Sequence, residues 1–139
     1  APFSNYGVNM VDIAAPGMLI ESAIPGNDYL EVSGTSQAAP YVANVAAQIK
    51  DSNPELTPVQ IKKILMGTVD KKGFLRTKVN AQGIVNKDRA ILAAEMSRSM
   101  KLENAITKSR SVVKDVPTTK TENAIFENIV PIPLTPEFK

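Results

Sequence analysis

Alternating apolar and polar residues predict two short strands in the first quarter of the chain. The first covers residues 11–14 and ends at Pro16-Gly17, and the second covers residues 18–24. The turn sequence Pro25-Gly26-Asn27-Asp28 follows, and residues 29–33 then lead to Gly34-Thr35-Ser36. The chain therefore opens with short extended segments joined by turns.

An alanine-rich run predicts a long helix over residues 37–51. Small side chains occupy one face of this helix, and larger aliphatic residues supply its other apolar contacts: Ala39, Ala43, Ala46, Ala47, Val42, Val45 and Ile49. A helix that is apolar nearly all round is usually buried. We therefore expect this helix to lie in the middle of a domain.

Two more helices are predicted from the residues that begin them. Thr57 caps the first, Pro58 takes its first position, and Gln60 can reach back to the Thr57 amide. Its apolar stripe is Ile61, Ile64 and Leu65, and Gly67 is a plausible end. Asn86 caps the next helix, expected over about residues 87–101, and residues 71–73 and 75–79 are expected to form a loop and a short strand.

The composition of the chain changes after residue 101, so we divide it into residues 1–101 and residues 102–139. Residues 102–123 are polar with little periodicity, which predicts a linker or a surface strap. Residues 125–136 alternate apolar residues with proline, which favours an extended tail. Such a tail either occupies a groove, on its own domain or on a partner, or is disordered.

Ser36 is the residue of the chain whose side chain is a candidate nucleophile. It stands at the start of the alanine-rich helix, where backbone N–H groups converge and the helix dipole favours negative charge. A serine there is commonly an ordinary N-cap. It can also attack a carbonyl carbon while nearby amides, its own included, stabilise the oxyanion that forms.

The stretch Gly34-Thr35-Ser36-Gln37-Ala38-Ala39-Pro40 resembles the nucleophile motif Gly-Thr-Ser-x-Ala-x-Pro of the subtilisin-like serine proteases, the subtilases. Residues 3–7, 11–17 and 20–29 follow the family's order before it, and residues 56–61 and 83–86 resemble its last helix and closing turn. The similarity extends over about residues 3–94. Departures from the commonest pattern, which leave specificity open, occur at Gln37, Ala39, Tyr41 and Asn44.

The resemblance implies an α/β fold: the C-terminal portion of a subtilisin-like parallel-sheet sandwich, with a buried helix after the nucleophile plus surface helices, incomplete on its own. It implies a serine endopeptidase in which Ser36 forms an acyl-enzyme. The chain contains no histidine, so it lacks the imidazole base of a Ser-His-Asp mechanism. By the family's chain order, a missing N-terminal portion would supply Asp, His and the oxyanion Asn.

Composition narrows the remaining classes of function. The net charge of +2 comes with basic residues scattered along the chain, which does not indicate binding to nucleic acid or to a membrane surface. No apolar run is long enough to span a membrane, and no signal peptide begins at Ala1. No cofactor is expected in this chain, although calcium is possible in the complete enzyme. Secretion is implied by the resemblance alone.

Other interpretations stay open. The chain can belong to a catalytically inactive subtilase-like pseudoprotease that binds or regulates another protein, or it can be an isolated fragment without a function of its own. Asp12 does not occupy the position of the family's catalytic aspartate. We interpret it as structural, because a carboxylate beside a turn most often bonds local amides. Val32 either contacts substrate on the leaving-group side of the cleft or packs within the domain.

Overall fold

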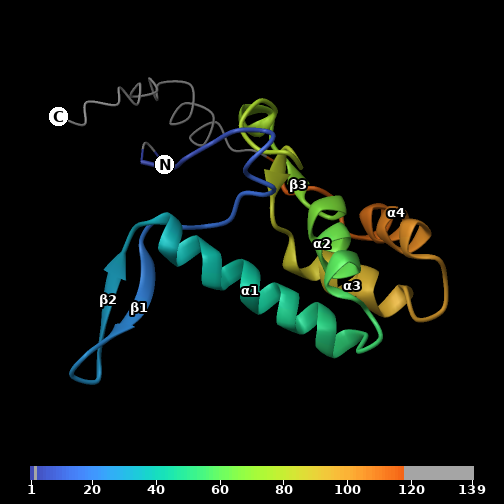
Figure 1. Cartoon of the computed structure of the whole chain (residues 1–139), viewed down its shortest axis with the longest axis horizontal. Coiled ribbons are helices and arrows are strands. Elements are labelled where there is room, and N and C mark those ends of the chain that lie inside the picture. Colours follow the sequence, from blue (N-terminus) through green and yellow to red (C-terminus); the bar gives the residue numbers. More distant parts are fainter. Residues whose placement is uncertain (2, 118–139) are drawn as a thin grey trace.

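The computed structural model describes residue 1 and residues 3–117 of the 139-residue chain. Four α-helices and two small sheets make up a mixed α/β arrangement in this part (Figure 1). In chain order the elements are β1 (Ile20–Ile24), β2 (Asp28–Val32), α1 (Thr35–Ser52), α2 (Pro58–Gly67), β3 (Asp70–Lys71), the 3-10 helix η1 (Gly73–Leu75), β4 (Gly83–Ile84), α3 (Lys87–Met96) and α4 (Leu102–Val112).

Strands β1 and β2 form an antiparallel hairpin directly before the candidate serine. Ile20 pairs with Val32, and Ile24 pairs with Asp28. The turn between them has left-handed backbone at Gly26 (φ 98°) and Asn27 (φ 61°), which suits the twist of a tight hairpin. The predicted strand over residues 18–24 is confirmed, with its start at Ile20.

Strands β3 and β4 form the second sheet, which is also antiparallel. The predicted strand at residues 11–14 is reduced to one parallel bridge, between Ala14 and Ile84. The expected parallel-sheet sandwich is therefore absent from the described residues, which contain only the two small antiparallel sheets. The strand expected at residues 75–79 is wrong, because the amides of Lys78 and Val79 both donate to the Leu75 carbonyl and coil the backbone.

The hydrophobic core lies between the C-terminal half of α1 and the other helices, on the right in Figure 1. Its main cluster consists of Val45, Ile49, Leu56, Ile64, Leu65, Val85, Ala90, Ala93 and Ala94. Among the described residues, no buried hydrophobic side chain precedes Val45. The first third of the chain, including the hairpin, thus contributes no fully buried apolar residue.

Helix α1 is less buried than we expected from its sequence. Val45 and Ile49 are its only buried residues, whereas Ala39, Ala43 and Ala47 are exposed. The expectation of a helix buried on all sides is therefore wrong for this chain, because only one edge of α1 has other elements packed against it. Helix α1 is rich in apolar residues, but most of its apolar surface is not covered by other elements.

The predicted starts of α2 and α3 are confirmed by their hydrogen bonds. The Thr57 amide donates to Gln60 Oε1 at 2.8 Å, and the Gln60 amide donates to Thr57 Oγ1 at 3.3 Å, which completes a capping box. Asn86 Oδ1 accepts from the Arg89 amide at 2.8 Å. Helix α3 ends at Met96 rather than near residue 101, where the Ser97 hydroxyl donates to the Ala94 carbonyl and competes with the helical pattern.

The linker expected from residue 102 is wrong over residues 102–112, which form helix α4. Ala105 and Ser109 on this helix are buried, and α4 packs along α3. The buried side of α4 follows a helical spacing, at Leu102, Ala105, Ile106 and Ser109. Because Ala105 is small and Ser109 is polar, these residues do not give a clear hydrophobic period in the sequence. The expected tail at residues 125–136 lies outside the described residues.

A buried arginine ties the segment after α4 to the rest of the fold. Arg89 is completely buried, and its guanidinium donates to the carbonyls of Val113 (2.8 Å), Thr68 (3.0 Å) and Val69 (2.9 Å). It also pairs with Asp115 Oδ1 at 2.8 Å. Residues 113–115 are therefore fixed against α3 by a fully desolvated cation.

Candidate active site

Ser36 is the second residue of α1, and the N-cap position belongs to Gly34. Gly34 has extended backbone (φ 174°, ψ 160°) and provides no side-chain cap. Ser36 is exposed, and within the described residues its hydroxyl makes no hydrogen bond. The structure therefore excludes the ordinary N-cap role, and the hydroxyl is available to a reacting group.

The backbone before Ser36 is fixed by the segment that leads into β1. The Gly34 amide donates to the Gly17 carbonyl at 2.7 Å, and the Leu19 amide donates to Ser33 Oγ at 2.9 Å. A Cβ at Gly17 would lie 2.7 Å from the Gly34 carbonyl oxygen and 3.2 Å from the Ala38 Cβ. Only glycine therefore allows this close approach of two backbone segments.

The first turn of α1 points unsatisfied amides toward the same region. The first four N–H groups of a helix lack intrahelical partners, and the dipole favours an anion there. Of these, the Gln37 amide donates to the Gly34 carbonyl at 3.1 Å. The Ser36 amide makes no hydrogen bond in the part of the chain that the structure describes, so it is free to donate to an oxyanion.

The side chains around Ser36 are open to solvent. Tyr29 on β2 is 66% exposed, and Val32, at the end of that strand, is half-buried. A Cβ at Gly34 would lie 2.7 Å from Gln37 Oε1, so the Gln37 side chain extends back over the backbone before the serine. The hairpin and the first turn of α1 thus form an uncovered surface with Ser36 on it.

No imidazole base accompanies Ser36, because the chain has no histidine. Asp12 forms an exposed ion pair with Lys62 on α2 at 2.7 Å, and not the bonds to local amides that we expected. No group of three or more His, Cys, Asp or Glu side chains in residues 1 and 3–117 could hold a metal ion. In this part of the chain, no helix combines the length and apolar character that a membrane span requires.

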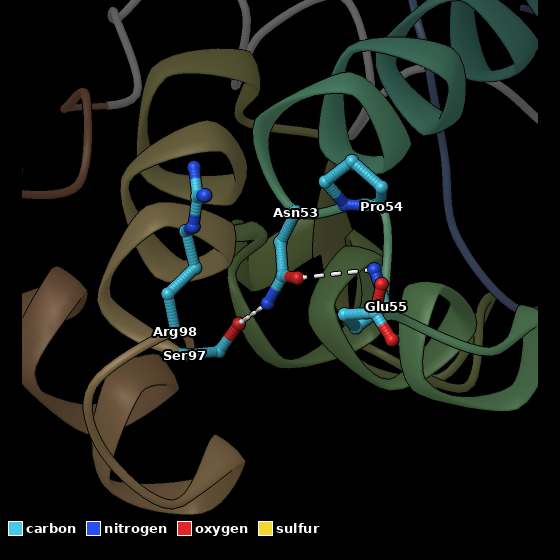
Figure 2. A pocket seen from close by; sticks show the side chains of 5 residues that line it. All are labelled: Asn53, Pro54, Glu55, Ser97 and Arg98. Carbon is cyan, nitrogen blue, oxygen red and sulfur yellow. Dashed lines mark hydrogen bonds between the residues drawn. The ribbon is translucent and has the colours of Figure 1, made fainter.

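A pocket of about 370 Å³ lies at the other end of α1 and is separate from the serine. Figure 2 shows its lining residues, Asn53, Pro54, Glu55, Ser97 and Arg98. The Asn53 amide group donates to Ser97 Oγ at 2.8 Å, and Asn53 Oδ1 accepts from the Glu55 amide at 3.2 Å. The bond between Asn53 and Ser97 joins the α1–α2 loop to the end of α3. With a helical rise of 1.5 Å per residue, about 25 Å separates this pocket from Ser36.

The sequence profile described as Subtilase family matches residues 1–94, which is most of the chain and includes Ser36. The chain belongs to the subtilase family. The match ends within α3, so α4 and the segment fixed by Arg89 and Asp115 lie beyond the matched residues.

Several subtilases are similar to this chain over about two thirds of its length. Alkaline elastase YaB from Bacillus sp. (strain YaB) is 43% identical over 90 residues, or 65% of this chain. Subtilisin BL from Lederbergia lenta is 41% identical over 90 residues, and subtilisin-like protease 1 from Plasmodium vivax is 39% identical over 96 residues, 65% and 69% of this chain. The chain spans 23%, 32% and 15% of these three proteins.

Two solved structures have a similar arrangement of elements. A structure reported for the assembly of subtilase cytotoxin SubAB covers 78% of this chain, with a TM-score of 0.60 and 31% identity, and 30% of that chain is covered. The A-subunit of the AB5 toxin from E. coli covers 62%, with a TM-score of 0.59 and 37% identity, and 28% of that chain is covered. The chain therefore matches a part of subtilase domains.

Proposed function

We propose that this chain is the nucleophile-bearing C-terminal portion of a subtilisin-like serine endopeptidase. Ser36 attacks the scissile carbonyl carbon of a protein or peptide and forms an acyl-enzyme, which water then hydrolyses. The supporting observation is the position of Ser36: it lies on the first turn of α1, exposed, with no hydrogen bond to its hydroxyl or its amide in the described residues. That amide is suited to donate to the oxyanion.

The base and the other catalytic groups come from outside this chain. A serine hydroxyl is a weak nucleophile without an adjacent base, and this chain has no histidine. In the family the Asp, His and oxyanion Asn precede the serine in the sequence. We therefore propose that a preceding N-terminal portion of the same protease supplies them, as a continuous chain or as an associated fragment.

The uncovered surface of α1 supports such a partner. Apolar side chains of the helix and of the segments before it are exposed, which is costly for a folded protein unless another surface covers them. They include Tyr41 on α1 (40% exposed) and, before the helix, Phe3 (52%), Tyr6 (55%), Met10 (89%), Met18 (54%), Leu19 (68%) and Leu30 (52%). The N-terminal portion would bury this surface and complete the larger parallel sheet. Secretion of the complete enzyme is part of the same proposal.

Labelling with a fluorophosphonate probe tests this function directly. The probe reacts with serines that an assembled catalytic site activates, so natively purified protein should carry the adduct on Ser36, located by mass spectrometry after denaturation. A Ser36→Ala variant should not be labelled, and Thr35→Ala should keep the label. Folded protein with an unmodified Ser36, next to a preceding portion that lacks the histidine, would identify a pseudoprotease instead.

A further inference from the structure

A second cavity, of about 340 Å³, lies beside β3 and is lined mainly by cations. Its lining residues are Lys71, Lys72, Gly73, Arg76 and Gln82. Among the residues that the structure describes, no aspartate or glutamate lines it. Its residues follow α2 and precede α3, and β3 lies in the upper part of Figure 1, away from the β1–β2 hairpin at the lower left.

One cation of this cavity is built into the fold. Lys72 is only 5% exposed, and its Nζ donates to the Val116 carbonyl at 3.0 Å. The Lys72 amide donates to the Gln82 carbonyl at 3.1 Å, which joins the two sides of the cavity. Gln82 has left-handed backbone (φ 56°), which is uncommon for a residue other than glycine, and its side chain is exposed. The cavity therefore has one buried cation, Lys72, whose position is fixed by hydrogen bonds of both its side chain and its backbone.

The other two cations have no carboxylate partner within residues 1 and 3–117. Lys71 Nζ donates to the Ala81 carbonyl at 2.7 Å, and Arg76 is exposed. Neither forms an ion pair in that part of the chain. Asp70 is the nearest carboxylate in sequence, but it is held by Arg89 at 3.2 Å and by Asn86 at 2.9 Å. Its charge is thus balanced by groups other than the cavity lysines.

We propose that this cavity binds an oxyanion, a carboxylate or a phosphate group. The Lys71 ammonium group and the Arg76 guanidinium supply donors for charge-assisted hydrogen bonds, and Gln82 adds an amide donor. Lys72, whose ammonium group already donates to the Val116 carbonyl, adds positive charge. The anion can come from two sources. One is a glutamate side chain of residues 118–139, which follow Val116 directly and contain Glu122, Glu127 and Glu137. The other is a free anion such as inorganic phosphate.

The test uses the complete protein that contains this chain, with Ser36→Ala to prevent self-cleavage. Calorimetric titration with sodium phosphate at constant ionic strength measures the affinity. Lys71→Gln with Arg76→Gln should weaken phosphate binding by about tenfold or more. The matched control, Lys63→Gln with Lys108→Gln, removes the same charge from exposed positions on α2 and α4 and should change the affinity by less than about twofold.

A second pair of proteins separates the two sources of the anion. If a tail carboxylate occupies the cavity, ending the chain after Pro117 should strengthen phosphate binding by about tenfold. If a free anion is the ligand, the full and shortened chains should bind phosphate equally. The proposal is overturned if neither chain binds phosphate, or if the cavity and control variants lose affinity equally. Arg76→Gln alone, at an exposed position, replaces the double variant should that one fail to fold.

Discussion

The Gly17 carbonyl accepts a hydrogen bond from the Gly34 amide at 2.7 Å, two residues before Ser36. This bond joins the segment before β1 to the turn that starts α1. The two backbones approach so closely that a methyl group on Gly17 would collide with the Gly34 carbonyl oxygen, at 2.7 Å. The position of the nucleophile in the proposed protease thus depends on a glycine far from it in sequence.

Gly17→Ala should therefore lower kcat/KM of the complete protease by about 10- to 100-fold, because displacement of a reacting group by about 1 Å is that costly. Peptide hydrolysis and fluorophosphonate labelling rates measure the effect. Gly26→Ala is the control: its methyl group meets nothing within 4 Å, but its φ of 98° is strained for alanine. It should reduce thermal stability and leave kcat unchanged. Equal losses of kcat in both variants would contradict a positioning role for Gly17.

Asp115 should contribute measurably to stability although it lies beyond the family-matched residues. Asp115→Ala removes the carboxylate that pairs with buried Arg89 at 2.8 Å and with Arg110 at 3.2 Å. We expect a loss of about 1–3 kcal/mol in the free energy of unfolding, because buried Arg89 then keeps Asp70 alone as a charged partner, at 3.2 Å, and the carbonyls around it do not replace the lost carboxylate. Urea denaturation of the complete protein measures it.

Glu103→Gln is the matched control for Asp115, since Glu103 is exposed on α4 and forms no ion pair in the described residues. Its effect should stay within about 0.5 kcal/mol. A loss of the same size for both variants would show that net charge, and not the contact with Arg89, is responsible.

The chain expressed alone should behave as a loosely packed state. Its exposed apolar surface on α1 and the hairpin lacks a partner, and its buried hydrophobic residues begin only at Val45. We expect no cooperative heat absorption in calorimetry and strong binding of the dye ANS. Co-expression with the preceding portion should restore a sharp transition. A single cooperative transition of the isolated chain would refute this prediction.

The local elements were predictable where side chains act on their own neighbours. Thr57 with Gln60, and Asn86, mark helix starts because their hydrogen bonds reach only three residues along the chain. Strand β1 is recognisable from alternation and from its turn residues. These signals need no knowledge of the rest of the fold.

Long-range relationships were not predictable from the same patterns. The composition of α1 is that of a buried helix, but composition does not say whether the surface that covers it is present. Helix α4 was not predicted because its buried residues are the small Ala105 and the polar Ser109, and most of its other residues are polar. Arg89 resembles a surface residue in the sequence, although it is completely buried and its guanidinium contacts polar groups of five residues, from Thr68 to Asp115.

For the candidate site, the motif predicts Ser36 as the nucleophile, and the absence of histidine predicts that a base comes from elsewhere; both stay predictions. The roles of Gly17 and Ser33 were not visible, because a turn glycine and a serine carry no sign of their distant backbone partners. The Asp12 side chain was expected to bond amides and instead reaches Lys62. Such pairings depend on how α2 packs, which no local pattern encodes.

Helix α1 has buried side chains only in its C-terminal half, and its N-terminal end is held by backbone contacts alone. Val45 and Ile49 are the buried residues, whereas Ser36 lies at the solvent-exposed end beside the Gly17–Gly34 hydrogen bond. From Val45 to Ser36 the helix extends about 14 Å, so a tilt of about 5° moves the serine hydroxyl by about 1 Å. That displacement separates a reactive hydroxyl from an inert one. Contact at the N-terminal end of α1 would therefore control activity as well as complete the fold, and proteolysis would begin only after assembly.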